Sequence, residues 1–208
     1  NGPSPGRAYF ERNESRRLTS QIRLDHKLAD APRGVLGGNR IATFKNSISL
    51  FNRTLDRPGY RFGGQQLATY TEASLLLNKM AHDVVLGVDL RSDRFSEDDG
   101  PVAELRDYSY SSAGVFAQDT WDISHKVVLE SGLRADYHNT FGLFLLPKAS
   151  MLYRVTDQVS TRLGGGLGYK APTVFLEPSE ERGFSGVIPL GPNVKAETSI
   201  GGSFDVNV

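Results

Sequence analysis

The chain has 208 residues, and its 24 Lys and Arg balance its 24 Asp and Glu, so the formal net charge is zero. This balance gives no reason to expect a nucleic-acid partner, because such proteins normally carry a basic excess. Cysteine is absent, which excludes disulfides, thiolate metal sites and cysteine nucleophiles.

The apolar runs are short. Phe141–Leu146 is among the longest, whereas a membrane helix needs roughly 20 apolar residues, so a helical membrane protein is excluded. A barrel strand needs only about 9–11 residues of alternating character, which this chain has. With 38% hydrophobic residues and 22 glycines, the composition favours a sheet that has one apolar face.

Alternation of apolar and polar residues with a period of two recurs along the whole chain. Because successive side chains of a strand point to opposite faces, each such stretch predicts a strand with one apolar and one polar face. The predicted strands cover residues 16–28, 40–53, 66–78, 82–95, 108–121, 126–139, 142–155, 158–170 and 196–208.

Three of these segments need comment. Thr71–Ala81 is also compatible with an amphipathic helix, so the pattern alone leaves both open. The alternation is clearest in His82–Phe95, where Val84, Leu86, Val88 and Leu90 share one face. In 108–121 it is blurred, because Asp119 shares parity with the apolar residues, which requires a bulge or a strand end.

The connections between the predicted strands alternate in length. Short turns lie at Asn78–His82, Asp122–Lys126 and Val155–Gln158, and long polar loops at Thr54–Gly64, Ser96–Asp107 and Ala171–Asn193. This order is typical of membrane barrels, which have short periplasmic turns and longer external loops. Two links depart from it: Asn139–Gly142 is short and Ala29–Asn39 is long.

No motif indicates catalysis. Gly164–Lys170 superficially resembles a phosphate loop, but the glycine spacing fails and Ala171-Pro172 prevents a helix from following. The four histidines lack metal-ligand spacing, and the acidic cluster Glu97–Gly100 lacks the EF-hand pattern. We therefore expect no enzyme activity, no metal site and no cofactor. Trp121, Tyr137, Tyr153 and Tyr169 fall near predicted strand ends and suit either an interfacial girdle or ordinary packing.

Several segments resemble a known family. Gly114–Trp121 followed by Leu129–Tyr137 looks like a paired-strand signature of TonB-dependent outer-membrane receptors. Leu146–Tyr153 and Gly166–Pro172 resemble the two strands that come next, and Val194–Thr198 resembles the return strand. The pieces occur in the family order across roughly residues 108–208.

The resemblance implies a 22-strand barrel with an N-terminal plug, located in the bacterial outer membrane. It implies uptake of a large, scarce ligand such as an iron–siderophore complex, haem, cobalamin or a glycan. The expected partners are outer-membrane lipid, the TonB complex acting through a plug, and that ligand. Because the chain has no recognisable plug and too few strands, we expect residues 1–208 to be a partial transmembrane β-barrel domain.

The fold expectation is therefore an all-β, antiparallel up-and-down meander of about nine strands, part of a larger barrel. Ligand-binding candidates are chosen by their position beside the long loops: Arg91, Asp93, Arg94, Lys170, Glu180, Glu181 and Arg182. Two alternatives remain open. A soluble β-sandwich binding module would need two sheets packed together, and a small self-contained barrel would need an even number of strands.

Overall fold

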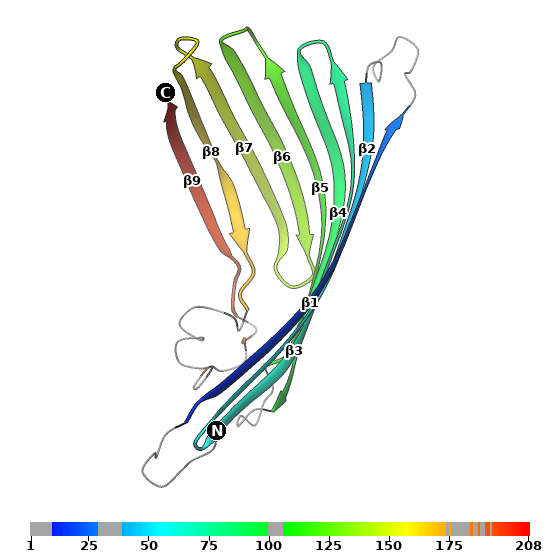
Figure 1. Ribbon diagram of the computed structural model, residues 1–208, viewed down its shortest axis with the longest axis vertical. Coiled ribbons are helices and arrows are strands. Elements are labelled where there is room, and N and C mark those ends of the chain that lie inside the picture. Colours follow the sequence, from blue (N-terminus) through cyan, green and yellow to red (C-terminus); the bar gives the residue numbers. More distant parts are fainter. Residues whose placement is uncertain are drawn as a thin grey trace.

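The computed structural model describes residues 10–28, 39–99, 106–173, 175, 184, 187, 190–191 and 193–208. These residues form one antiparallel sheet of nine strands whose order in the sheet follows the chain (Figure 1). The strands are β1 (Arg12–Leu28), β2 (Asn39–Arg57), β3 (Tyr60–Lys79), β4 (His82–Asp99), β5 (Tyr108–Asp122), β6 (Val127–His138), β7 (Gly142–Arg154), β8 (Ser160–Lys170) and β9 (Glu197–Asn207). The predicted nine-strand meander is confirmed. No helix in the described part of the chain is long and apolar enough to cross a membrane.

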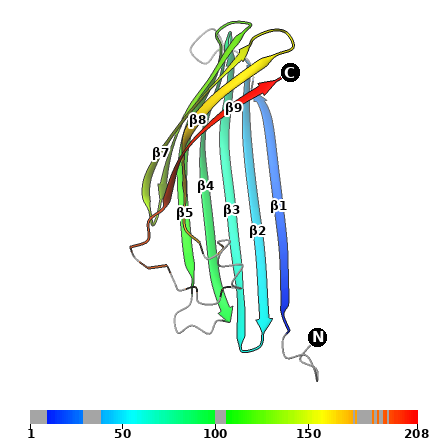
Figure 2. The ribbon, with the colours of Figure 1, turned by 90° about the vertical axis from the view of Figure 1, so that its left-hand side faces the viewer.

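The sheet is curved and open (Figures 1 and 2). Its edge strands β1 and β9 are not paired with each other. We call the end that carries the β2–β3 turn, the start of β5, the end of β8 and the start of β9 the loop end. The opposite end carries the β3–β4, β5–β6 and β7–β8 turns, and we call it the turn end.

In the middle of the sheet, apolar side chains are exposed and polar side chains are buried, which is the reverse of the pattern in a soluble protein. On β4, Val88 is 52% and Leu90 is 60% exposed, whereas Asp89 between them is 2% exposed. Neighbouring strands continue the pattern, with Val115 and Leu133 exposed on the same face. We call these the apolar face and the polar face. An exposed apolar face beside a self-paired polar face is what a lipid-facing barrel wall requires.

A small core lies on the polar face at the loop end. It consists of Leu55, Phe62, Phe95, Tyr108, Tyr110 and Phe184. The core therefore joins β2 to β5 with the segment that connects β8 to β9. No second sheet is present among the described residues, so the β-sandwich alternative does not describe this fold.

The pairing of β2, β3 and β4 tests two expectations from the sequence. Thr54–Gly64 is not a long loop: β2 and β3 stay paired to Arg57 and Tyr60, and Pro58-Gly59 forms the turn. Gly59 has φ +74°, which suits glycine after proline in a tight turn. Thr71–Ala81 is not a helix, because β3 continues to Lys79 and pairs with both neighbours.

Asp119 on the apolar face is explained by its position near a strand end. The β4–β5 and β5–β6 pairings run past it without a register shift. Its carboxylate lies 2.8 Å from His82 Nδ1, and the His82 ring stacks on Trp121 with centroids 5.3 Å apart. Trp121 and Tyr153 are exposed at the turn end, as an interfacial girdle requires, whereas Tyr169 stacks on Phe144 instead.

Candidate ligand-binding site

A cavity of about 260 Å³ lies on the polar face at the loop end. It is lined by β4, β5 and β6 and by the chain that leaves β8. The lining residues are Arg91, Asp93, Tyr110, Ser111, Ser112, His138, Tyr169, Ala171 and Thr173. We call it the loop-end pocket. Hydroxyl groups, ring faces and one exposed guanidinium therefore converge at a single place.

Stacked rings form the base of this region. Phe62, Phe95, Tyr108 and Tyr110 follow one another across β3, β4 and β5, with successive ring centroids 6.2, 5.7 and 4.8 Å apart. Phe184 covers Phe62 at 4.2 Å. Tyr110, the last ring of this row, lines the pocket, and the stacked rings behind it hold it in place.

A buried ion pair ties the loops together beside the rings. The side chains of Arg106 and Glu97 are both fully buried, and the guanidinium donates to both carboxylate oxygens. Arg106 Nη1 also donates to the Phe184 carbonyl oxygen at 2.7 Å. Hydrogen bonding to the Glu97 carboxylate raises the pKa of Arg106 above its ordinary value. Arg106 is thus a fixed positive charge that links the β4–β5 connection to the β8–β9 segment.

A second ionic network lies next to the pocket, towards the turn end. Arg134 contacts Asp89 from both Nη1 and Nη2 at 2.8 Å and places Nε 2.7 Å from Asp136. Arg91 Nε lies 3.2 Å from Asp89. The two carboxylates are buried, and the two guanidinium groups neutralise them, so Asp89 and Asp136 do not act as free ligand acceptors.

Gly114 makes room for this network. A Cβ atom at position 114 would contact Asp136 Oδ1 and would lie 2.6 Å from Arg134 Nη2 and 2.8 Å from Asp89 Oδ2. All three atoms belong to the ion-pair network. The absence of a side chain on β5 therefore allows charges on β4 and β6 to meet across it.

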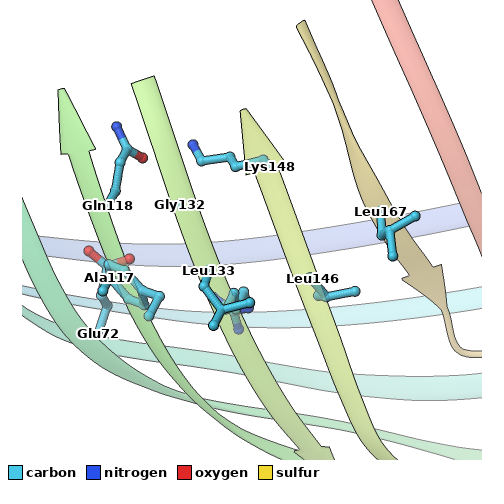
Figure 3. A pocket seen from close by; sticks show the side chains of 10 residues that line it. Glu72, Ala117, Gln118, Gly132, Leu133, Leu146, Lys148 and Leu167 are labelled. Atoms are coloured by element: carbon cyan, nitrogen blue, oxygen red, sulfur yellow. The ribbon is translucent and has the colours of Figure 1, made fainter. Parts of the chain in front are cut away.

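A larger cavity of about 380 Å³ lies further along the polar face (Figure 3). Leu146, Leu167 and Phe116 contribute apolar surface, and Lys148 and Arg134 contribute charge. Lys148 Nζ is already 3.1 Å from Glu130. We take the loop-end pocket as the candidate site, because it lies at the loop end and contains Arg91 and Asp93.

The residues predicted from sequence occupy different places. Arg91 and Asp93 both line the loop-end pocket. Arg94 is exposed on the opposite face, because it alternates with Asp93 along β4. Lys170 is exposed at the end of β8 and does not line the pocket. Glu180, Glu181 and Arg182 lie outside the described residues.

Sequence reasoning did not select Tyr110, His138 or Tyr169. The alternation in the sequence could place Tyr110 and His138 on the polar face. It could not show which residues lie beside them, because that depends on how the strands pair. Ser112 lies opposite both Arg91 and His138, which brings β4, β5 and β6 together at this point. Among the described residues, no group of three or more His, Asp or Glu side chains is placed to hold a metal ion.

A nine-strand wall with an exposed apolar face and a polar, ion-paired face belongs to the class of transmembrane β-barrels. The family described as TonB dependent receptor-like, beta-barrel, matches residues 1–204. The chain therefore belongs to the TonB-dependent receptor-like β-barrel family. A comparison with curated proteins found no match.

Solved structures share the fold. The siderophore receptor PirA from Pseudomonas aeruginosa matches 91% of this chain with 15% identity and a TM-score of 0.59. A variant of the ferric enterobactin receptor PfeA from Pseudomonas aeruginosa, in complex with enterobactin, matches 92% with 17% identity and a TM-score of 0.57. The alcaligin outer membrane receptor FauA from Bordetella pertussis matches 78% with 13% identity and a TM-score of 0.61. The chain spans 37%, 33% and 30% of these three chains, respectively.

Proposed function

We propose that this chain forms part of the wall of a bacterial outer-membrane receptor that takes up a large, scarce ligand such as an iron–siderophore complex. In this proposal the TonB complex drives uptake through a plug domain, and the barrel itself catalyses no reaction. The loop end faces outside, since the longer connections of membrane barrels are external. The three solved relatives described above are siderophore receptors, which supports this ligand class over haem, cobalamin or a glycan.

The inverted sheet is the observation that carries the proposal. Large apolar residues are exposed in register across the sheet, for example Leu90, Val115 and Leu133. A soluble protein seldom leaves an apolar patch of this extent uncovered. Lipid contact accounts for this exposure, and it also accounts for the charges that are paired on the other face.

The ligand is proposed to contact the loop-end pocket. Arg91 and Asp93, two of the residues selected from the sequence, line it. Lys170 stands at the end of β8 beside the same region, and Glu180, Glu181 and Arg182 stay a prediction for the connection that follows. Arg94 is left out of this proposal because its exposed side chain lies on the opposite face.

Uptake by the full-length receptor that contains this chain tests the proposal. The receptor is produced in a bacterial host that lacks its own siderophore receptors, with and without a functional TonB complex. Accumulation of radiolabelled ferric enterobactin, ferric alcaligin, haem and cyanocobalamin is then measured. We expect uptake of at least one ferric siderophore, and only with functional TonB. Failure to accumulate any of the four probes, or equal accumulation without TonB, contradicts the proposal.

A further inference from the structure

The apolar face has a hollow towards the turn end. A cavity of about 350 Å³ lies there. Five of the residues that line it belong to the apolar face by their strand pairing: Val84, Ala117, Asp119, Ser131 and Leu133. The side chains of Ala117 and Ser131 are small, so the surface is recessed between larger apolar neighbours. On a face that meets lipid, such a recess has the shape to receive part of a lipid molecule.

Asp119 places a carboxylate in this hollow. Its Oδ2 atom lies 2.8 Å from His82 Nδ1, whereas its Oδ1 atom is buried and has no hydrogen-bond partner in the described part of the chain. An acceptor that has lost water without gaining a donor is unfavourable, so an added N–H group at Oδ1 stabilises the site. The Asp119 side chain is 34% exposed, and a carboxylate rotates readily about χ2, which lets Oδ1 meet a group that enters the hollow.

Two aromatic rings stand beside Asp119, on the side of the turn end. The His82 ring stacks on Trp121 with an interplanar angle of 17°. Because an ionised carboxylate only accepts hydrogen bonds, His82 donates from Nδ1, and the neutral ring then keeps a lone pair on Nε2. Trp121 is 41% exposed, and the face of an indole attracts cations. A carboxylate oxygen, an imidazole lone pair and an indole all favour a cation that carries N–H groups.

The charges around Asp119 fit such a cation. Val84 and Ser131 lie directly opposite Asp119 on β4 and β6, and neither side chain is charged. Lys79 lies opposite His82 on β3, on the same face of the sheet. The hollow therefore has a negative group inside it and a positive group further along the turn end, which matches a headgroup that contains both an ammonium and a phosphate.

We propose that this hollow binds a phospholipid with a primary ammonium headgroup, as in phosphatidylethanolamine. The ammonium donates to Asp119 Oδ1 and His82 Nε2 and lies against Trp121. An acyl chain fills the recess over Ala117 and Ser131. This inference rests on the membrane-wall part of the proposed function, and it goes beyond that function by assigning one headgroup chemistry to one place on the lipid-facing surface.

The test uses the purified full-length receptor in detergent micelles and measures bound lipid by native mass spectrometry. The probes are phosphatidylethanolamine, phosphatidylcholine and phosphatidylglycerol, all with dioleoyl chains. The choline nitrogen has no N–H group and the glycerol headgroup has no cation, so neither donates a charge-assisted hydrogen bond from an ammonium. We expect phosphatidylethanolamine to bind at least about fivefold more tightly than the other two, because it alone makes that bond to the carboxylate.

Asp119→Asn should weaken phosphatidylethanolamine binding about fivefold and remove the preference for it, because the amide has no charge. Asp157→Asn is the matched control, since it removes the same charge from the exposed β7–β8 turn, outside the hollow, and it should leave binding unchanged. Both variants are checked for the heat-modifiable mobility of a folded barrel. Unchanged binding in Asp119→Asn, or phosphatidylcholine or phosphatidylglycerol binding as tightly as phosphatidylethanolamine, overturns the proposal.

Ser131→Leu tests the recess separately from the charge. It keeps the Asp119 carboxylate and suits a lipid-facing surface, but its side chain fills the hollow. We expect weaker phosphatidylethanolamine binding in a receptor that still shows the heat-modifiable mobility of the folded state. Binding as tight as in the unaltered receptor would show that no acyl chain occupies the recess.

The lipid site and the uptake function fail in different ways. A receptor that prefers phosphatidylethanolamine through Asp119 but transports no ferric siderophore keeps the lipid site and loses the uptake function. A receptor that transports a ferric siderophore, and whose lipid binding is the same with Asp119→Asn, keeps the uptake function and loses the lipid site.

Discussion

At the residue scale, Gly114 shows how one missing side chain permits a buried charge network. β5 passes between β4 and β6 at this position, and Arg134 reaches across it to Asp89 while it also contacts Asp136. Each buried carboxylate would be costly without its guanidinium partner, because an unpaired buried charge loses its hydration without compensation. The network therefore depends on the space that a glycine leaves.

Gly114→Ala should destabilise the folded receptor by roughly 1–3 kcal/mol, the usual range for forcing an extra methyl group into a packed site. The methyl group would displace Arg134 or one of its two carboxylate partners. Urea unfolding of the full-length receptor in lipid vesicles measures the change. Gly201→Ala is the matched control, because a Cβ atom there meets nothing within 4 Å. Equal stabilities of the two variants would contradict the role of Gly114.

At the scale of elements, Arg106 connects parts of the chain that are far apart in sequence. It follows β4, pairs with Glu97 inside that strand, and holds the Phe184 carbonyl oxygen in the segment between β8 and β9. Phe184 has φ +62°, a left-handed conformation that a phenylalanine adopts at an energetic cost. The contacts of Arg106 and the stacking of Phe184 on Phe62 offset that cost.

Arg106→Met should destabilise the receptor by about 3–5 kcal/mol, because it leaves the Glu97 carboxylate buried without a partner. The double variant Arg106→Met with Glu97→Leu should recover most of that loss, since both charges are then removed. Unfolding in urea is again the measurement. Arg12→Met serves as control, because the Arg12–Glu14 pair is exposed and should contribute about 0–1 kcal/mol. A single Arg106→Met variant as stable as that control would show that the buried pair does not stabilise the link between these segments.

The elements show which features a sequence reveals. Period-two alternation located all nine described strands, because each strand has one face in a different environment from the other. It did not reveal that β2 and β3 continue past Thr54 and Gly64, since there the apolar residues Leu55 and Phe62 fall on the parity of the polar face and interrupt the alternation. The Pro58-Gly59 pair was the remaining local signal for a tight turn there.

The candidate site was predictable only in part, for a physical reason. Arg91 and Asp93 were selected because they precede a long connection and alternate with apolar residues, which places them on the polar face. Arg94 was selected because it is also close to that connection, although it follows Asp93 directly and therefore lies on the apolar face. His138 and Tyr169 reach the pocket through pairing and stacking between strands, and such long-range contacts leave no local pattern in the sequence.

At the scale of the whole molecule, the sheet is built around the contrast between its two faces. Charges on the polar face are paired from strand to strand, for example Lys45 with Glu72 and Arg134 with Asp89. Among the described residues, the middle part of the apolar face carries no such ion pair, and Val88 lies there opposite Ala73 on β3 and Val115 on β5. This asymmetry predicts that the same charge has different consequences on the two faces.

Val88→Arg should reduce the stability of the assembled receptor by about 2–4 kcal/mol, the cost of an arginine near the bilayer midplane on the lipid side of a barrel. Gln118→Arg, on the polar face of β5, should cost far less, because its side chain lies beside the larger polar-face cavity. Urea unfolding in vesicles measures both, and heat-modifiable mobility in the outer membrane reports assembly. If the polar face were the one in contact with lipid, Gln118→Arg would be the more damaging change. Nearly equal effects would mean that neither face meets lipid, and the membrane-wall interpretation would then have to be abandoned.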